Sequence, residues 1–320
     1  MEENIVVQSG TSDEWNISGS LEGNINSKNL VIMIHGGGYD RHENGIYPVI
    51  SDGKPKKELK GDRLVSVFEK KPYGNYDRLS IELQARDIDT AIFRYDVRNH
   101  GKSLVNNEMD TRDTSWERFA RDLSSIIKYL KFKYGYENIH LVGTCMGALT
   151  AHYYITGSGK NETIDMNDRD SVKSVTLISP LANEILCTNN EKHGFNYIKT
   201  QSIVNGEVKQ FTKMKGLFEG IETVNEARRN LDLPEKVAST MLPIKYIVSY
   251  SDRLIPTDVS MRIIETMKSN PNFEYSILNK EEIKGAADHC FYDPQSSDAC
   301  LLECTNYLEN MIVRDNQLNM

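Results

Sequence analysis

The sequence has no long hydrophobic run. Its apolar stretches are far shorter than the roughly 20 residues that a membrane-spanning helix needs, so no membrane span is expected. Its start also lacks the basic residues, apolar run and small-residue cleavage site that together mark a secretory signal. These two absences predict a cytoplasmic protein.

Cysteine is scarce. The 320 residues contain five cysteines, with no C-x-x-C pair and no zinc-type spacing. An odd, scattered set is typical of a reducing compartment, where thiols stay free, and not of a disulfide framework. We therefore expect a thiol that is free to react, no metal and no organic cofactor.

An excess of positive charge is also missing. The 38 Lys and Arg residues are outnumbered by 46 Asp and Glu residues, which gives a formal net charge of -8. Nonspecific binding to nucleic acid or to an anionic membrane requires a basic surface, so neither partner is expected. The hydrophobic content of 39% and charged content of 26% are ordinary for a globular protein, and this length permits one α/β core with an inserted subdomain.

Apolar strands and amphipathic helices alternate along much of the chain, which is typical of parallel βαβ units. The strands are short apolar runs, and residues 116–134 repeat apolar side chains at steps of three and four. The predicted fold class is α/β, with a mostly parallel central sheet and helices on both faces. The expected strands are 30–34, 90–95, 172–179, 244–249 and 273–278, and the expected helices are 77–87, 116–134, 258–268 and one that ends near residue 313.

Three segments depart from this alternation. Residues 5–22 alternate weakly and predict two antiparallel strands at a sheet edge, and residues 39–76 lose periodicity and predict a long loop insertion. Residues 182–240 contain Asn205-Gly206, a hairpin signal, and an insertion at this point is where a lid would cover a site. The predicted division is a core at 1–181, a lid or cap at 182–240 and the second part of the core at 241–320.

The stretch that carries most chemistry is residues 139–150, which reads as a buried strand, a turn and the start of a helix. In its turn, Gly143 and Gly147 flank Cys145. The pattern G-x-nucleophile-x-G between a strand and a helix is a nucleophile elbow, and the two glycines let strand and helix approach closely. The alternative is an ordinary turn around a buried thiol, since free cysteine is among the most buried residue types.

A second glycine-rich turn follows the strand at residues 30–34. His35 is followed by Gly36, Gly37 and Gly38, whose backbone N–H groups have no side chains to shield them. Such groups suit the binding of an oxyanion. The alternative is a flexible turn.

With three further landmarks, these turns resemble the α/β-hydrolase superfamily across nearly the whole chain. The three are an Asp-x-Arg-x-His-Gly-x-Ser segment at residues 96–103, a strand-end Asp252 followed by Pro256, and a late His289. Nucleophile, then acid, then histidine is the order that this fold imposes. The resemblance implies an α/β-hydrolase fold with an inserted lid.

The resemblance also implies roles for individual residues. Cys145 is the expected nucleophile, His289 the general base and then acid, and Asp252 the carboxylate that orients the imidazole. A thiol is only a few per cent ionised at neutral pH, so an imidazole that accepts its proton raises its reactivity. The implied oxyanion donors are the N–H group of Met146 and an N–H group of Gly36 or Gly37.

Other residues of the same types are weaker candidates. Asp288 adjoins His289, but neighbours on an extended loop point apart, and Asp258 falls at a predicted helix start. Asn99 stands where the superfamily usually has glycine, and asparagine tolerates the left-handed conformation that such a turn requires. The remaining histidines are expected to be structural or have no motif around them: His35, His100, His140, His152 and His193. The remaining cysteines are expected to be packing residues: Cys187, Cys290, Cys300 and Cys304.

A cysteine at the elbow is either the natural nucleophile or a replacement for serine. A natural cysteine favours substrates with good leaving groups, because a thiolate exchanges with thioesters at little thermodynamic cost, whereas a thioester formed from an ordinary ester is uphill. Members of the superfamily that this chain resembles in using cysteine include dienelactone hydrolases, polyester synthases and some carrier-protein thioesterases.

The expected function is acyl transfer through a thioester acyl-enzyme, as a thioesterase or acyltransferase that acts on an activated acyl ester or thioester. One alternative is an ester or lactone hydrolase similar to dienelactone hydrolases. Another, of a different class, is a non-catalytic scaffold whose thiol binds a ligand or senses oxidation. The locally basic stretch at residues 54–71 could dock an acyl carrier protein or CoA, or it could be a solvated surface loop.

Overall fold

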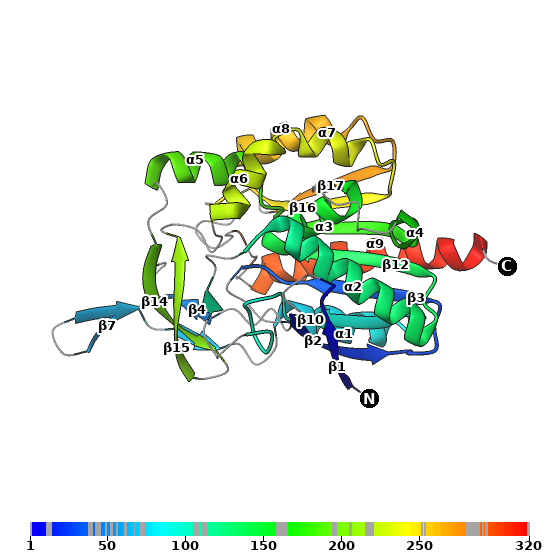
Figure 1. Ribbon diagram of the computed structural model, residues 1–320, viewed down its shortest axis with the longest axis horizontal. Coiled ribbons are helices and arrows are strands. Elements are labelled where there is room, and N and C mark those ends of the chain that lie inside the picture. Colours follow the sequence, from blue (N-terminus) through cyan, green and yellow to red (C-terminus); the bar gives the residue numbers. More distant parts are fainter. Residues whose placement is uncertain are drawn as a thin grey trace.

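A computed structural model gives the fold of the chain (Figure 1). The residues that it describes are 2–10, 15–37, 41, 46–48, 50–51, 54–55, 57–60, 63–66, 68–70, 74–104, 109–110, 114–157, 166–193, 197–204, 207–214, 221–250, 252, 254–278, 289, 291 and 294–318.

One eight-stranded sheet forms the centre of the molecule, in the order β1-β2-β10-β3-β12-β13-β16-β17. The six strands from β10 to β17 run parallel, while β2 pairs antiparallel with both β1 and β10, so the antiparallel edge predicted for residues 5–22 is confirmed. The strands are β1 (Glu3–Gln8), β2 (Asn16–Gly23), β3 (Asn29–Ile34), β10 (Ala91–Tyr95), β12 (Asn138–Thr144), β13 (Val172–Ile178), β16 (Ile244–Ser249) and β17 (Phe273–Leu278).

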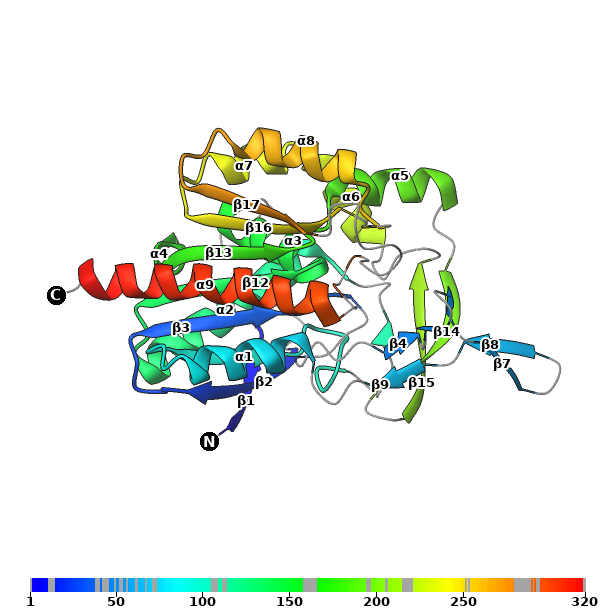
Figure 2. The same ribbon diagram turned by 180° about the vertical axis from the view of Figure 1, so that it is seen from behind.

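Helices cover both faces of this sheet, which confirms the predicted fold class. Helices α1 and α9 lie together on one face (Figure 2), and α2, α3 and α8 lie on the other (Figure 1). The helices are α1 (Asn75–Ala85), α2 (Trp116–Tyr134), α3 (Met146–Thr156), α4 (Met166–Asp170), α5 (Asn183–His193), α6 (Ile221–Arg229), α7 (Leu233–Ala238), α8 (Thr257–Met267) and α9 (Pro294–Leu318).

The alternation of side chains along the strands divides the core into two layers. In β3, Leu30, Ile32 and Ile34 enter the core on the face of α2 and α3. Val31 and Met33 point the other way, into the core on the face of α1 and α9. A parallel strand covered on both faces has to be apolar at every position, which is why it reads as a continuous apolar run in the sequence.

The segment expected as a long loop at residues 39–76 contains short strands instead. These strands pair antiparallel two by two, and α1 begins at Asn75, within the expected loop. Strands of two to four residues are too short for their alternation to be visible in the sequence. The pairs are β4 (Ile46–Pro48) with β9 (Phe68–Lys70), β5 (Ile50–Ser51) with β6 (Lys54–Pro55), and β7 (Lys57–Lys60) with β8 (Arg63–Ser66).

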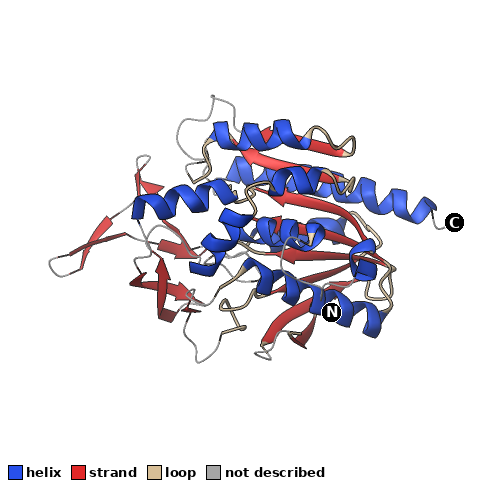
Figure 3. Ribbon diagram, turned by 45° about the horizontal axis from the view of Figure 1, so that its top comes forward, coloured by secondary structure: helices blue, strands red, loops and turns tan. Residues whose placement is uncertain are grey.

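Residues 182–240 combine α5, a hairpin, α6 and α7. The hairpin joins β14 (Tyr197–Val204) to β15 (Glu207–Met214), which confirms the pairing predicted from Asn205-Gly206. Strand β15 also pairs with β11 (Met109–Asp110), so a short segment of the first core part extends the sheet of the insertion. The strands of this small sheet lie apart from the central sheet, beyond the carboxyl ends of its parallel strands (Figures 1 and 3).

Candidate active site

Cys145 occupies a strained turn between β12 and α3. Its φ of 52° and ψ of -110° place it outside the conformations that side-chain-bearing residues ordinarily adopt. Hydrogen bonds hold the turn, because its N–H donates to the Ile178 carbonyl (2.9 Å) and its carbonyl accepts from the N–H groups of Leu149 (3.2 Å) and Leu181 (3.3 Å). The thiol therefore sits on a backbone that the neighbouring strand and helix keep fixed.

The two glycines of the elbow are required by close backbone contacts. A Cβ atom on Gly147 would lie 1.9 Å from the carbonyl oxygen of Ile34, and one on Gly143 would lie 2.6 Å from the carbonyl oxygen of Gly147. Both neighbours are backbone atoms, which cannot rotate away as a flexible side chain can. The elbow thus packs directly against the end of β3, where the glycine-rich turn begins.

Asp252 and His289 are hydrogen-bonded to one another although they lie 37 positions apart in the sequence. Nδ1 of His289 lies 2.7 Å from Oδ2 of Asp252. The other carboxylate oxygen, Oδ1, accepts the N–H groups of Leu254 (2.8 Å) and Ile255 (2.9 Å). Because Asp252 follows β16 directly, these backbone donors fix the carboxylate at the carboxyl edge of the sheet, and the carboxylate in turn orients the imidazole.

The imidazole of His289 lies beside Cys145 and is nearly buried, with 9% of the residue exposed. Burial opposes its protonation, but the negative charge of a Cys145 thiolate and the hydrogen bond to Asp252 outweigh that effect, and the pKa of His289 is raised well above its usual range. Among the described residues, its Nε2 atom has no nitrogen or oxygen hydrogen-bond partner. This leaves Nε2 for exchange of a proton with the thiol or with a substrate.

His35 organises the second glycine-rich turn. Its Nε2 atom accepts the N–H group of Val97 (2.9 Å), so the proton is on Nδ1, which donates to the carbonyl oxygen of Gly36 (2.7 Å). Complete burial lowers the pKa of His35 to about 3, so the ring is neutral. In a trans peptide the carbonyl and the N–H point in opposite directions, so the bond to Gly36 turns the N–H of Gly37 away from His35.

The segment at residues 96–103 contacts this turn through the bond from Val97 to His35. The carboxylate of Asp96 accepts the backbone N–H of Arg41 (2.8 Å), its Nε (3.0 Å) and its Nη2 (2.7 Å), and all of these groups are buried. Asn99 has a φ of 65°, the left-handed conformation expected of it. The sequence alone had no signal for Arg41, because the residue lies where the periodicity breaks.

The competing candidates have other partners. Asp258 is exposed and pairs with Arg262 on its own helix (2.8 Å). His152 bonds to the Tyr246 hydroxyl (2.8 Å), and Nδ1 of His100 bonds to the Arg98 carbonyl (3.0 Å). Cys300 and Cys304 are buried in the core, as expected of packing residues. The side chain of His193, and Asp288, Cys290 and Gly38, lie outside the described residues.

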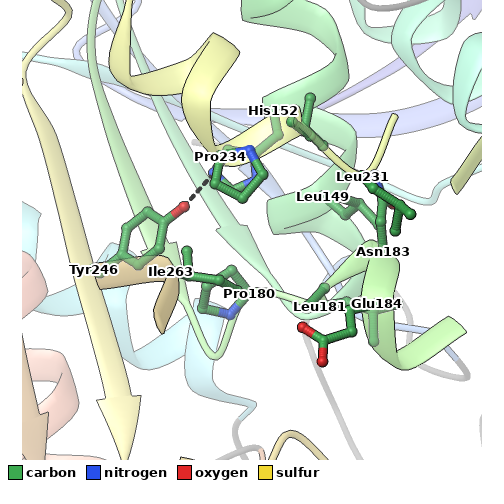
Figure 4. A pocket seen from close by; sticks show the side chains of 12 residues that line it. Leu149, His152, Pro180, Leu181, Asn183, Glu184, Leu231, Pro234, Tyr246 and Ile263 are labelled. Carbon is green, nitrogen blue, oxygen red and sulfur yellow. Dashed lines mark hydrogen bonds between the residues drawn. The ribbon is translucent and has the colours of Figure 1, made fainter. Parts of the chain in front are cut away.

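A small apolar cavity adjoins the elbow (Figure 4). Leu149 and Leu181, whose N–H groups bind the Cys145 carbonyl, both line it, and its volume is about 60 Å³. The hydrogen-bonded pair of Tyr246 and His152 closes one side, as the dashed line in Figure 4 shows. Burial lowers the pKa of His152 to about 3, so this wall carries no charge at neutral pH.

Helix α6 is joined to the start of α2 by a carboxylate that the sequence did not reveal. Glu226 of α6 accepts the Ser115 hydroxyl (2.6 Å) and the Trp116 N–H (2.6 Å), and so caps the first turn of α2. The indole N–H of Trp116 donates in return to the carbonyl of Thr223 (3.1 Å). Burial raises the pKa of Glu226 to about 7.

Within the described part of the chain, no three His, Cys, Asp or Glu side chains come together as a metal site would require. Every described helix is too short or too polar to cross a bilayer.

Known proteins agree with this architecture. Residues 29–200 match the family model described as alpha/beta hydrolase fold. Among solved structures, the chain is similar to the α/β hydrolase GrgF from Penicillium sp. sh18 (TM-score 0.59, 13% identity, 98% and 99% of the two chains covered) and to a monoacylglycerol lipase from Paleococcus ferrophilus (0.58, 15%, 92% and 99%). It is also similar to the esterase Pf2001 from Pyrococcus furiosus (0.57, 17%, 98% and 92%).

No curated protein matches the chain in sequence. At these identities the solved structures establish the fold, and the family match extends over more than half of the chain. The match supports the expected type of enzyme, a hydrolase or esterase. The chain belongs to the alpha/beta hydrolase fold family.

Proposed function

We propose that the protein is an acyl-transfer enzyme in which Cys145, His289 and Asp252 act as a catalytic triad on an activated acyl ester or thioester. The observation that carries the proposal is the 2.7 Å hydrogen bond between Asp252 and His289, which leaves Nε2 of the imidazole beside a thiol held on a strained elbow. Each component has a physical role in acyl transfer, whereas a merely structural cysteine requires none of them.

In the first half-reaction, His289 takes the proton of the Cys145 thiol, the sulfur attacks the carbonyl carbon of the substrate, and the carbonyl oxygen becomes an oxyanion. The N–H groups of Met146, at the open first turn of α3, and of Gly37 are the proposed donors to that oxyanion. As the tetrahedral intermediate collapses, the bond to the leaving group breaks and the imidazolium of His289 gives it the proton. The products are the free thiol or alcohol and a thioester acyl-enzyme.

In the second half-reaction, water or another acceptor attacks the thioester. His289, now neutral, takes the acceptor's proton and returns it to the Cys145 sulfur as the carbon–sulfur bond breaks. Water gives the free acid, and an amine, alcohol or thiol gives the transferred product. Asp252 stabilises the imidazolium that forms in both half-reactions, and its bonds to Leu254 and Ile255 keep it in place.

A thioester is the proposed substrate class because of the sulfur nucleophile. Exchange of one thioester for another is nearly neutral in free energy, whereas formation of a thioester from an ordinary ester is uphill. Docking of a carrier protein or CoA at residues 54–71 stays a prediction, since those side chains lie outside the described residues.

A second candidate is an ester or lactone hydrolase. Its support is that the similar solved structures include an esterase and a monoacylglycerol lipase. An activated ester or lactone also offers a good leaving group, so the same triad could open it. The two candidates differ in substrate and share every proposed residue.

Turnover of matched substrates tests the proposal. A short acyl thioester, the corresponding activated ester and a lactone are incubated with the protein, with and without added amine, alcohol or thiol acceptors. Thioester cleavage that Cys145→Ala abolishes is expected, and faster cleavage of the lactone would favour the second candidate. Free acid as sole product with every acceptor would exclude an acyltransferase and leave a thioesterase. Oxidation of Cys145 without turnover of any substrate would support the non-catalytic thiol instead.

A further inference from the structure

The parallel pairing of β3 and β12 ends just before the site. The last paired residues are Ile34 and Gly143. Beyond them, β3 continues into the turn that contains Gly36 and Gly37, and β12 continues through Thr144 into Cys145. The distance between the proposed nucleophile and the proposed oxyanion donors therefore depends on contacts other than the sheet itself.

The side chain of Tyr76, from α1, supplies such a contact. Its hydroxyl oxygen lies 2.7 Å from the carbonyl oxygen of Ile34 and 2.9 Å from Oγ1 of Thr144. A carbonyl can only accept, so the tyrosine proton points to Ile34, and the Thr144 hydroxyl must donate to the tyrosine oxygen. One buried hydroxyl thus joins the last residue of β3 to the last residue of β12.

The surroundings of Tyr76 hold it firmly. The residue is 1% exposed, and its ring packs in the core between the sheet and α9. Tyr76 and Thr144 line a cavity of only about 10 Å³ together with Phe291, which follows His289 by two residues and has a φ of 53°. The tyrosine therefore lies next to three parts of the proposed site: the end of β3 at Ile34, the elbow at Thr144, and Phe291, two residues after His289.

The carbonyl that Tyr76 binds is the same one that presses against the elbow. The oxygen of Ile34 occupies the position that a Cβ atom on Gly147 would need, 1.9 Å away. Its direction sets the start of the turn in which His35 fixes the Gly36 peptide. A rotation of the Ile34 carbonyl would move Gly37 relative to Cys145 and Met146.

We propose that Tyr76 is a positioning residue that fixes the oxyanion donors relative to the Cys145 sulfur, through its hydrogen bonds to Ile34 and Thr144. The inference rests on the proposed acyl-transfer function. Loss of the hydroxyl should impair reactions that pass through an oxyanion and spare reactions of the same thiol that do not. Misplacement of donors by a fraction of an ångström to 1 Å is expected to slow acylation by about 10- to 100-fold.

Two reagents distinguish these reactions. An acyl thioester modifies Cys145 through a tetrahedral oxyanion, whereas iodoacetamide alkylates it at a saturated carbon and forms none. Both rates are measured on the Cys145 peptide by mass spectrometry in the wild type and in Tyr76→Phe. The matched control is Tyr136→Phe, because Tyr136 is also a buried tyrosine that bonds a backbone carbonyl, that of Ile25 (3.3 Å), at the opposite end of β12.

In Tyr76→Phe, acylation should fall about 10- to 100-fold while alkylation stays at the wild-type rate; Tyr136→Phe should change neither. Thr144→Val should reproduce the selective loss, and Thr144→Ser, which keeps the hydroxyl, should restore acylation. Unchanged acylation in Tyr76→Phe, or equal losses of acylation and alkylation, would overturn the role of Tyr76 alone. A wild type that is alkylated but never acylated would overturn the proposed function itself, and the role of Tyr76 with it.

Discussion

Oδ2 of Asp252 lies 2.7 Å from Nδ1 of His289, while Oδ1 of the same carboxylate is held by two backbone N–H groups. The backbone that follows β16 therefore fixes the carboxylate independently of its contact with the imidazole. Among the described residues, Nε2 of the imidazole has no nitrogen or oxygen partner, so the pair has a defined direction, from the sheet edge through the ring towards Cys145.

Asp252→Asn should slow acylation of Cys145 by roughly 100-fold or more. The amide is nearly isosteric but cannot stabilise an imidazolium, and it can favour the wrong tautomer of His289. The measurement is the rate of thiol release from an acyl thioester under single-turnover conditions. Asp258→Asn is the control, since that carboxylate is exposed and pairs with Arg262 along α8; an equal loss in both variants would contradict the assignment.

The pH dependence of thiol alkylation should change in His289→Gln. The pKa of His289 is raised well above 6.5 by a Cys145 thiolate and Asp252, so the ring keeps its proton at neutral pH when the thiolate is beside it. The positive charge of the ring then lies beside the sulfur that attacks the reagent, and a neighbouring positive charge stabilises a thiolate. A thiol without this partner is only a few per cent ionised at pH 7, so alkylation of His289→Gln at that pH should be about tenfold slower.

The comparison is made with iodoacetamide between pH 6 and pH 9. At pH 9 the alkylation rates of the wild type and His289→Gln should approach one another, because an ordinary thiol is largely ionised at that pH. Parallel profiles of alkylation rate against pH across the whole range would show that His289 does not control the reactivity of the Cys145 thiol.

Gly147→Ala should destabilise the fold by about 3 kcal/mol or more. The added methyl group would overlap the carbonyl oxygen of Ile34, a backbone atom in the central sheet. Gly135→Ala is the control: Gly135 has a φ of 77° but open space around it, so only the cost of a left-handed alanine applies, about 1 to 2 kcal/mol. Urea unfolding measures both free energies, and a smaller loss at Gly147 than at Gly135 would contradict the close packing of the elbow.

Glu226 should make stability depend on pH. Its pKa is about 7 in the folded protein and 4.5 ordinarily, so the folded state favours the protonated acid. The resulting stabilisation is complete below pH 4.5 and is lost as the pH rises through about 7, with a full range on the order of 3 kcal/mol.

Glu226→Gln removes this titration and keeps an acceptor at the start of α2. The free energy of unfolding should therefore fall less between pH 5 and pH 8 in Glu226→Gln than in the wild type. Glu222→Gln, at an exposed position on the same helix, should change this pH dependence much less, because the charge of Glu222 is the smallest of the effects on the pKa of Glu226. An identical pH dependence of the unfolding free energy in the wild type and Glu226→Gln would show that Glu226 does not take up a proton on folding in this pH range.

Much of the central sheet was predictable because its strands are covered on both faces. Such strands appear as continuous apolar runs. Cys145 was singled out by its two flanking glycines, and Asp252 by the order of landmarks that resembles the α/β-hydrolase superfamily. The amphipathic pattern of α2 likewise predicted its bounds of Trp116 and Tyr134.

The contacts that sequence reasoning missed join residues far apart in the chain. Arg41 pairs with Asp96, Tyr76 with Ile34 and Thr144, and Glu226 with Ser115. Each is a single polar side chain whose partner depends on the tertiary fold, so no local pattern marks it. The pairing of β11 with β15 was hidden for the same reason, since a two-residue strand has no periodicity.

The most direct test of the triad is the intact mass of the protein after brief incubation with a short acyl thioester, followed by mapping of the modified peptide. One acyl group on Cys145 is expected in the wild type and none in Cys145→Ala, with formation of the adduct slowed strongly in His289→Ala. An adduct that forms on another cysteine, persists in Cys145→Ala, or forms at the wild-type rate without His289 would contradict catalysis by this triad.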